Sequence, residues 1–398
     1  MNDTNVYINL DNIANNAKNI TQKYNDYKYY IGILKSSCYG HGEYIVNELV
    51  NNGINYIAVS YIDEALKIRK YNKTIPILLL EPISLSEIEK VTENNLTIVI
   101  HDLSYLNELL KLKIKKKIKV HIKIDSGMNR LGFKDKNEVK IAYDLIKGCS
   151  FLEVEGIFTH FATIGLFDKH YDDQVKNFES LTSLIDLSEI PIVHLSSSVI
   201  LLSHPKLSYV NGVRTGILLY GYNVSPVYSN KGIKNKLRNI RNSYFRKKYN
   251  ISDLIYNVKL DLKPAMSMET SILQIKDVKK GEVIGYGATY KASEDIKIAV
   301  LPIGYNNGIG RKNINRYVLI NDKKYFVVGE IAMNMMIIKI DDNVNINDKV
   351  YVLGNGITLG TLSRFNDYSI SETLLNVGKN NKRVYIKNKK VEYIDEIR

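Results

Sequence analysis

The stretch YYIGILKSSCYGHGEYIVNELVNNG (residues 29–53) contains one complete strand–loop–helix unit. It starts with an apolar run, passes through a loop of small residues, and continues in a segment with helical periodicity. The apolar residues of that last segment recur at the spacing of one helical face: Ile45, Val46, Leu49 and Val50. The stretch therefore predicts a β-strand followed by an α-helix.

The same unit recurs along the first half of the chain. Eight apolar segments are mostly separated by helical patterns within about 220 residues: YYIGILKSS, INYIAVS, IPILLLE, LTIVIH, KVHIKIDSG, LEVEGIFTHFA, PIVHLSSS and YVNGVRTG. Strands that alternate with helices predict a parallel sheet. Eight such units predict a closed, TIM-like β/α barrel.

The pattern changes from about residue 260 onward. Short β-rich segments follow one another, separated by glycines and Asn-Asp pairs: AMSMETSILQI, KIAVLPIGY, KKYFVVGEIAM and DKVYVLG. They predict a mainly antiparallel β domain. We therefore expect three parts: a β/α barrel over residues 1–227, a basic insertion or linker over 228–259, and a C-terminal β domain over 260–398.

Composition limits the class of protein. The chain has 398 residues, which is enough for two domains. Its two cysteines, Cys38 and Cys149, predict no disulfide framework and suggest a reducing compartment. The N-terminus shows no signal peptide, and no apolar run approaches the length of a membrane span. We expect a cytoplasmic protein with no membrane partner.

Two basic clusters stand out in this chain, whose net charge is +13. KLKIKKKIKV (111–120) alternates with apolar residues, which predicts the entry to a strand with a solvated face. KGIKNKLRNIRNSYFRKK (231–248) holds eight basic residues and no acid. A solvated insertion is the main prediction there, and binding of an anionic partner is the alternative. Because no nucleic-acid motif accompanies the cluster, we expect no nucleic-acid partner.

In a β/α barrel the active site forms at the carboxyl ends of the strands. Polar residues at the predicted strand ends are Lys35, Lys123, Arg130, His160, Ser197, Ser198 and Arg214. A lysine at the barrel mouth can form a Schiff base with a carbonyl compound or with pyridoxal phosphate. The small residues at 197–198 and 215–216 would let backbone N–H groups approach a phosphate. Each residue alone is an ordinary loop residue, but their convergence on one rim predicts a site.

Eight motifs, in order over essentially the whole chain, resemble the alanine racemase family of barrel enzymes that use pyridoxal phosphate. They are Lys35 with YGHG (39–42), KIDSGMNRLGF (123–133), GIFTHFA (156–162), HLSSS (194–198), VRTGILLYG (213–221), GYGATY (285–290), LPIGY (301–305) and GEIAMN (329–334). One such motif would be weak, whereas eight in register are specific. The resemblance implies an amino-acid racemase.

The resemblance also implies how the cofactor is held. Lys35 would bind pyridoxal phosphate covalently, and Arg214 would face its pyridine nitrogen. His160 would pack beside the ring and help to orient Arg214, with His194 behind it. The other cofactor-binding residues implied are Tyr39, Ser197, Ser198, Gly216, Ile217 and Ser371. No metal is implied.

Substrate binding and proton transfer are implied in the same way. Arg130 and the backbone at Met333 would approach the carboxylate of a small amino acid. Lys123 stands where family members often carry a carbamate, which would anchor Arg130. Tyr286 would enter the site from the partner subunit of a homodimer, so that Lys35 and Tyr286 serve opposite faces of Cα. The expected reaction is the interconversion of L- and D-alanine.

The chain departs from the family pattern at three places. Ser371 stands where a tyrosine is usual, and Asn307 and Asn334 stand where aspartates are usual. The insertion near 228–258 is longer than the usual linker. A smaller residue at 371 leaves room for a serine side chain, so a serine or broader-specificity racemase is the alternative. A non-racemising cofactor-binding barrel would lack GYGATY, and a decarboxylase would need a cysteine motif in the second domain.

Overall fold

The computed structural model describes residues 4–163, 169–223, 232–248, 260–313 and 315–396. The chain divides into two compact units, which we describe separately. The barrel unit comprises Ala14–Lys35 and Val46–Lys263. The β-unit comprises Met1–Ile13, Ser36–Ile45 and Pro264–Arg398.

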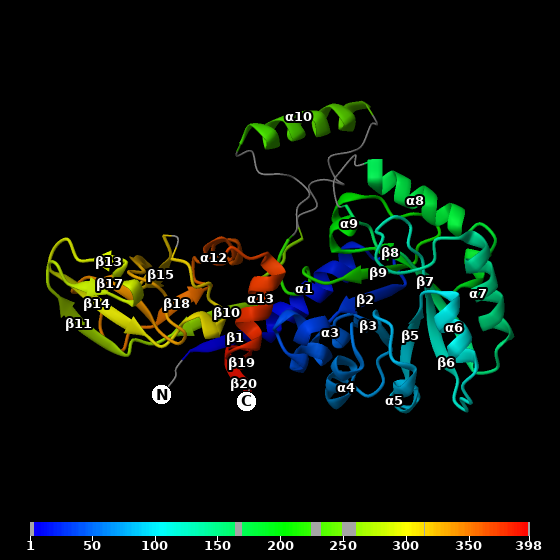
Figure 1. Ribbon diagram of the computed structural model, residues 1–398, viewed down its shortest axis with the longest axis horizontal. Coiled ribbons are helices and arrows are strands. Elements are labelled where there is room, and N and C mark those ends of the chain that lie inside the picture. The colour runs from blue at the N-terminus through cyan, green and yellow to red at the C-terminus, as the bar shows by residue number, and fades with distance from the viewer. Residues whose placement is uncertain (1–3, 164–168, 224–231, 249–259, 314, 397–398) are drawn as a thin grey trace. The chain divides into compact units, whose positions relative to one another are not determined.

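The barrel unit contains a closed barrel of eight parallel strands, as the sequence predicts (Figure 1). Each strand pairs with the next along the chain, and β9 closes the ring on β2 in a register that joins Gly212 to Tyr29. The strands are β2 (Tyr29–Ile33), β3 (Tyr56–Val59), β4 (Ile77–Leu79), β5 (Leu96–Ile100), β6 (Ile118–Lys123), β7 (Leu152–Phe158), β8 (Ile192–Ser196) and β9 (Gly212–Thr215).

Helices lie on the outside of this ring (Figure 1). They are α3 (Val46–Asn51), α4 (Ile62–Tyr71), α5 (Ile88–Glu93), α6 (Leu103–Leu110), α7 (Lys136–Gly148), α8 (Lys169–Leu181) and α9 (Ser198–Ser203), and α1 (Leu10–Lys23) precedes β2. α7 illustrates why these segments are helical. The Asp135 carboxylate accepts from two N–H groups of its first turn, and Val139, Ala142 and Ile146 form its buried face.

Each unit has its own cluster of buried apolar side chains. In the barrel, buried side chains from several strands pack together: Ile31, Tyr56, Ala58, Leu78, Val99, Phe158 and Ile192. In the β-unit, a second cluster joins Val278, Ile284, Ala292, Ile296, Ile298 and Val328. Burial of this apolar surface is the main force that holds each unit together.

The β-unit is built on a seven-stranded sheet with the order β16-β15-β18-β10-β1-β19-β20. Its strands are β1 (Asn5–Asn9), β10 (Met266–Thr270), β15 (Tyr317–Ile320), β16 (Lys323–Phe326), β18 (Val350–Leu353), β19 (Lys382–Lys387) and β20 (Lys390–Asp395). Smaller sheets contain β11 (Gln274–Val278), β14 (Ile296–Leu301) and β17 (Met336–Ile340), and β12 (Val283–Ile284) with β13 (Tyr290–Lys291). The helices are α2 (Lys35–Tyr39), α12 (Leu359–Asn366) and α13 (Ile370–Lys379). All the pairings are antiparallel except that of β1 with β19.

The unit boundaries differ from the predicted ones at two places. Residues 1–13 belong to the β-unit, because β1 pairs with β10 on one side and with β19 on the other. Residues 36–45 also belong to the β-unit. No local pattern in the sequence reveals either assignment, since both depend on contacts with residues more than 250 positions further along the chain.

The two basic clusters have different structures. The first is a loop that enters β6 only at Ile118. The second forms α10 (Ile233–Lys248), where the described side chains, such as Lys236, Ile240 and Arg241, are exposed. The other predicted linker residues, 228–231 and 249–259, lie outside the described residues.

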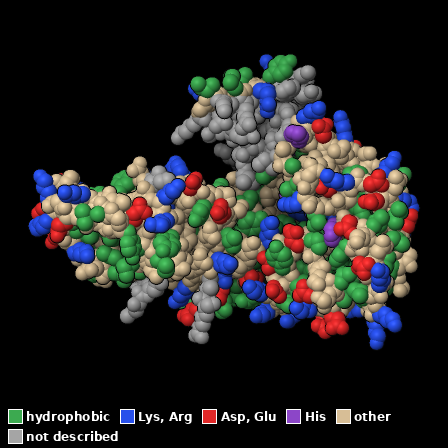
Figure 2. Space-filling view, viewed as in Figure 1, with side chains coloured by type: hydrophobic (Ala, Val, Ile, Leu, Met, Phe, Trp, Pro, Cys, Tyr) green, Lys and Arg blue, Asp and Glu red, His purple; other side chains and the backbone are tan. Residues whose placement is uncertain are grey.

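The described surface carries both signs of charge. On the face shown in Figure 2, Lys and Arg side chains are interspersed with Asp and Glu side chains. Among the described helices, none is long and apolar enough to cross a membrane. The two cysteines, Cys38 and Cys149, are not joined in a disulfide.

Candidate active site

The loop after β2 turns in the left-handed sense. Lys35 starts α2, and the next four residues, Ser36 to Tyr39, have φ angles of 54°, 51°, 53° and 52°. This conformation costs a non-glycine residue about 1–2 kcal/mol. Strain of this kind persists only where the surrounding structure imposes it, and it concentrates at functional sites.

Contacts within the β-unit hold this turn in place. Gly40 has a φ of 82°, and a Cβ atom there would overlap the Leu374 carbonyl of α13 and lie 3.1 Å from the Cα atom of Gly378. The Arg383 guanidinium of β19 donates to Ser37 Oγ at 3.1 Å. The glycine after Tyr39 is therefore required both by the backbone conformation and by the close approach of a helix.

The barrel unit gathers the predicted rim residues. The carboxyl ends of parallel strands meet at one rim of a barrel. The predicted residues there are Lys35 after β2, Lys123 at the end of β6, His160 after β7, Ser197 and Ser198 after β8, Arg214 in β9, and Gly216 and Ile217 beyond it. The structure thus brings the barrel part of the predicted site to one place.

Arg214 is a buried cation without a carboxylate partner among the described residues. Its guanidinium donates to the carbonyl oxygens of Thr159 at 2.7 Å and Leu195 at 2.9 Å. It also donates to His194 Nδ1 at 2.9 Å. Burial, followed by the charge of Arg130, lowers the pKa of Arg214 to about 9, so it remains protonated at neutral pH. The positive charge is fixed in orientation and is available to an anion or a lone pair.

Lys123 is also buried, with its Nζ atom 4.4 Å from the centre of the Phe158 ring. Burial, and then the charges of Arg214 and Arg130, lower the pKa of Lys123 to about 7. A large part of the Lys123 amine is therefore neutral near physiological pH. Neutral amines are nucleophiles, whereas ammonium groups are not.

Arg130 lies on the loop after β6, and its side chain is exposed. The loop is shaped by the Asp125 carboxylate, which accepts from the N–H groups of Asn129 at 2.9 Å and Arg130 at 3.1 Å. Because these bonds engage the carboxylate, Asp125 organises the loop rather than pairing with the Arg130 guanidinium.

His160 shows how the rim charges combine. Burial lowers the pKa of His160 to about 3, and the charges of Arg214, Lys123, Arg130 and Lys35 contribute to this shift in that order. The imidazole therefore stays neutral at physiological pH. Its Nδ1 atom lies 3.4 Å from Arg214 Nη2.

The loops after β8 and β9 meet at Ser198. Its hydroxyl accepts from the Gly216 N–H at 2.9 Å. Ser197 is half-buried and Ile217 is buried, while the neighbouring Thr215 hydroxyl is buried with no partner among the described residues. The predicted cradle is therefore formed by small polar groups and backbone.

This donor set fits pyridoxal phosphate. Four basic side chains and several hydroxyl and N–H donors surround the rim, and the carboxylates whose charge acts on Lys123 are Glu81 and Asp125. Such an excess of positive charge favours a ligand that carries a phosphate and a phenolate. Lys35 supplies the amine that a carbonyl group of the ligand requires.

The β-unit carries the other predicted residues. GYGATY and GEIAMN are neighbours, because a Cβ atom on Gly285 would lie 3.4 Å from the Glu330 nitrogen. LPIGY packs against the same segment, since the Tyr305 N–H donates to the Ala332 carbonyl at 3.1 Å. The predicted site residues of this unit are Tyr39, Tyr286, Met333, Asn334 and Ser371.

Tyr286 is 69% exposed on a tight turn. Gly285 and Gly287 have φ angles of 77° and 67°, which a residue with a side chain rarely adopts. Met333 and Asn334 are also exposed. The phenol is therefore held in solvent by its backbone, where it is accessible to another surface.

Ser371 and Asn307 occupy different settings. Ser371 is exposed in the first turn of α13, which Ser369 caps. Asn307 is buried, and its amide donates to Asn381 Oδ1 at 2.8 Å, while Asn381 donates to the Asn307 carbonyl at 2.9 Å. The Asn307 side chain is therefore held by hydrogen bonds with Asn381, another amide residue.

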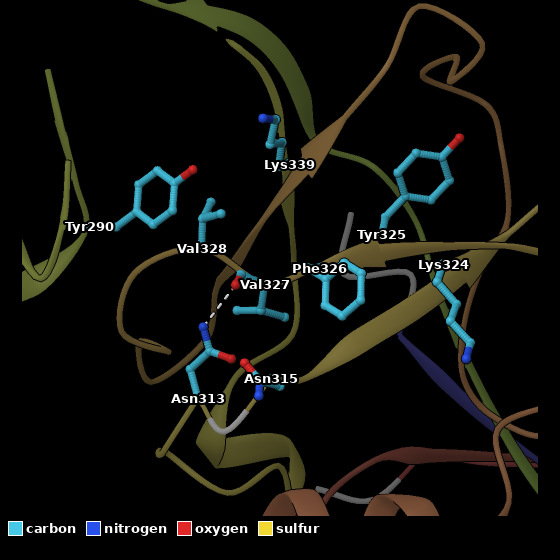
Figure 3. Close-up of a pocket in the computed structure, with 9 residues that line it drawn as sticks. All are labelled: Tyr290, Asn313, Asn315, Lys324, Tyr325, Phe326, Val327, Val328 and Lys339. Atoms are coloured by element: carbon cyan, nitrogen blue, oxygen red, sulfur yellow. Dashed lines mark hydrogen bonds between the residues drawn. The ribbon is translucent and has the colours of Figure 1, made fainter. Parts of the chain in front are cut away.

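A pocket in the β-unit contains none of these residues. Its volume is about 360 Å³, and the Asn313 amide beside it donates to the Val327 carbonyl at 2.8 Å (Figure 3). Its lining residues are Tyr290, Asn313, Asn315, Lys324, Tyr325, Phe326, Val327, Val328 and Lys339. Nothing in its chemistry connects it with the predicted site.

Sequence reasoning missed one feature of the barrel unit. Behind His194 lie further buried polar side chains, among them His121 and Glu155. The sequence could have indicated them, because the segments HIK (121–123) and LEVEG (152–156) place ionisable residues inside apolar strands. A buried histidine or glutamate within a strand is rare unless it is paired.

Two family models match the chain. They are described as "Alanine racemase, N-terminal domain", over residues 8–224, and "Alanine racemase, C-terminal domain", over residues 265–385. Together they cover most of the chain.

Curated relatives and solved structures agree with these models. The chain is 35% identical to an alanine racemase of Methanococcus maripaludis, over 87% of this chain and 88% of the relative. It is 34% identical to an alanine racemase of Borreliella burgdorferi, over 96% of each. Among solved structures, an alanine racemase of Clostridium difficile aligns with a TM-score of 0.85 at 30% identity, covering 99% of this chain and 98% of that one.

Proposed function

The chain belongs to the alanine racemase family, and we infer that it interconverts L- and D-alanine. The observation that carries the inference for this chain is the rim of the barrel, where four basic side chains lie at strand ends and on the loops after them: Lys35, Lys123, Arg130 and Arg214. A reactive amine beside an excess of fixed positive charge is suited to a phosphorylated carbonyl cofactor and an amino-acid carboxylate.

We propose that pyridoxal phosphate is the cofactor. Lys35 would hold it through its amine, and Ser198 with the Gly216 backbone would hold its phosphate. When bound, the cofactor supplies the conjugated ring over which the electron pair left on Cα is delocalised. Arg214 would donate to its ring nitrogen and, unlike an aspartic acid, has no readily released proton for that nitrogen.

Racemisation needs a proton-transfer group on each face of Cα. We propose that Lys35 serves one face and Tyr286 of a second copy serves the other. In one direction the Lys35 amine removes the Cα proton and the Tyr286 hydroxyl returns a proton to the opposite face. The reverse direction exchanges these roles, and the total number of protons does not change. Two such groups at fixed positions let either enantiomer react.

The proposal is tested first by finding the lysine that binds the cofactor. Purified protein supplied with pyridoxal phosphate is reduced with borohydride, digested and mapped by mass spectrometry. The label is expected on Lys35. Lys123 is the matched control, because it is the other lysine at the rim and its amine is partly neutral. A label on Lys123 or on a surface lysine would contradict the assignment.

Racemisation of alanine is measured in the same preparation from each enantiomer. Conversion that requires added pyridoxal phosphate and is lost in Lys35→Ala supports the inferred function. Absence of conversion in a cofactor-loaded protein would overturn it.

A further inference from the structure

A chain of buried polar side chains crosses the interior of the barrel below the rim. It starts at Glu155 on β7, a buried carboxylate. Glu155 accepts from the Tyr56 hydroxyl at 2.6 Å, from the Thr97 hydroxyl at 3.2 Å and from Lys119 at 2.7 Å. A buried carboxylate with this many donors is held in its ionised, acceptor-only form.

Two imidazoles connect this carboxylate to Arg214. His121 Nε2 lies 3.3 Å from Glu155 Oε2, and His121 Nδ1 lies 2.9 Å from His194 Nε2. The next link is His194 Nδ1, 2.9 Å from Arg214 Nη1. Both histidines are fully buried. Burial lowers the pKa of each imidazole, so each ring carries one proton.

The two ends decide where these ring protons lie. A guanidinium can only donate, so His194 Nδ1 must accept and its proton must be on Nε2. That proton is donated to His121 Nδ1, so the proton of His121 must also be on Nε2. There it meets the carboxylate of Glu155, which can only accept. Every bond of the chain therefore points from Arg214 toward Glu155. Arg214 Nη1 also donates to the His194 carbonyl oxygen, so it keeps an acceptor if the His194 ring changes its tautomer. The Glu155 carboxylate is therefore the end of the chain that holds this order of protons.

Two glycines make room for these histidines. A Cβ atom on Gly156 would lie 2.6 Å from His121 Nδ1 and 2.8 Å from His121 Nε2. A Cβ atom on Gly212 would lie 3.0 Å from that of His194. Gly156 leaves room for the His121 ring, and Gly212 leaves room for the Cβ atom of His194, on the strands that pair with theirs.

We propose that Glu155 is a positioning residue, which fixes the proton order of His121 and His194 and thereby holds Arg214 as an oriented donor toward the ring nitrogen of the cofactor. The role of Arg214 toward the cofactor rests on the proposed function. The positions of the histidine protons can be measured without cofactor or substrate. A purely structural role would require only that the donors around Glu155 be satisfied. A positioning role predicts that the histidine protons change position when Glu155 is replaced, whereas a purely structural role predicts that they do not.

The first test reads the ring protons directly. Protein with ¹⁵N-labelled histidine, free of cofactor, is examined by NMR at neutral pH, with signals assigned from His121→Asn and His194→Asn. Both rings of the wild type are expected to be protonated on Nε2. In Glu155→Gln, the amide can present its NH₂ group to His121 as well as its oxygen, so mixed proton positions are expected. Glu155→Met, which offers no acceptor, should also lose the single order.

Tyr56→Phe is the matched control. It removes one of the donors to Glu155 from the same buried cluster but leaves the carboxylate and both imidazoles in place. It is expected to lower stability while leaving the ring protons on Nε2. An unchanged proton order in both Glu155 variants, or an equal change in Tyr56→Phe, would overturn the proposal.

The second test concerns Arg214. In Glu155→Gln, the affinity for pyridoxal phosphate and kcat are expected to fall by about 10-fold, by analogy with other groups that orient a histidine from behind. KM for alanine should change little, because Glu155 does not touch substrate. Tyr56→Phe should keep both values near those of the wild type. If the wild type does not racemise alanine, the proposed function is wrong. The NMR measurement still shows whether Glu155 determines the positions of the histidine protons.

Discussion

Lys123 is the rim residue whose chemistry depends most on its surroundings. Its amine is buried beside two arginines, and it has no ion-pair partner among the described residues. The neutral amine can attack carbon dioxide to form a carbamate and release one proton. We propose that this modification converts an unfavourable buried cation into an anion near Arg130 and Arg214, which would relieve the repulsion among three positive charges.

The shifted pKa of Lys123 predicts a pH dependence of stability. Below pH 7 the amine is protonated in both states, whereas from about pH 7 to 10 only the unfolded chain binds that proton. The free energy of unfolding of the wild type should therefore rise with pH in this range, relative to Lys123→Met. Denaturant unfolding at pH 6 to 9 in CO₂-free buffer measures the difference.

Lys119→Met is the control for this measurement. Lys119 is a half-exposed lysine of the same strand whose pKa is raised, mainly by its hydrogen bond to Glu155, so its proton count does not differ between states below pH 9. Its difference from the wild type should be flat over the same range. A flat difference for Lys123→Met as well would show that the amine keeps an ordinary pKa.

We predict that Ser371 affects which amino acids the protein racemises. Serine, where the family usually has a tyrosine, lacks the phenol ring and is smaller. We expect measurable racemisation of serine beside the main reaction on alanine, and a lower serine-to-alanine ratio in Ser371→Tyr. A difference of one methylene in a pocket is worth about 1–3 kcal/mol, so the ratio is the quantity to compare.

Ser369→Ala is the control for Ser371→Tyr. It alters the cap of the same helix without adding bulk. It should lower stability and leave the serine-to-alanine ratio unchanged. If the tyrosine variant also keeps the wild-type ratio, then Ser371 does not determine specificity.

At the scale of elements, the turn Ser36–Tyr39 links sequence to site. YGHG predicts a loop, but four consecutive left-handed residues cannot be read from Ser-Ser-Cys-Tyr, none of which favours that conformation. The conformation is imposed by α13 and β19, which lie more than 300 residues further along the chain. Local propensity therefore gives the position of the loop and not its shape.

Gly40→Ala tests whether the approach of α13 holds this turn. Its φ of 82° costs an alanine about 1–3 kcal/mol, and overlap with the Leu374 carbonyl adds to this cost. Gly281→Ala is the matched control, because Gly281 has a φ of 93° and a Cβ atom added there would meet no described atom within 4 Å. Denaturant unfolding should show a larger loss for Gly40→Ala than for Gly281→Ala. Equal losses would mean that only the backbone angle matters.

The barrel was predictable because its signal is local and repeated. Each strand is an apolar run, each run ends at a polar residue, and parallel order brings those ends together without further information. Lys35, Lys123 and Arg214 follow from this rule. The chain from Arg214 to Glu155 does not, because it depends on which ring nitrogen faces which neighbour. Its central bond also joins His121 of β6 to His194 of β8, two strands that are not adjacent.

At the scale of the whole molecule, the rim residues and Tyr286 lie in different units. The sequence pattern cannot decide which copy of the β-unit completes a given barrel rim, because both arrangements contain the same residues and motifs. The exposure of Tyr286 in a single chain supports the shared site that we propose. A closed twofold dimer would then have two equivalent sites, each with residues from both chains.

Mixing two inactive variants tests this shared site. One chain carries Lys35→Ala and the other Tyr286→Phe, and each alone should lack one of the two proton-transfer groups. In a mixed dimer, the Lys35 of the second chain meets the Tyr286 of the first, so one site is complete while the other lacks both groups. With random exchange about half of the dimers are mixed, and roughly one quarter of the wild-type activity should return. If subunit exchange is verified by mass and no activity returns, then both groups must come from the same chain.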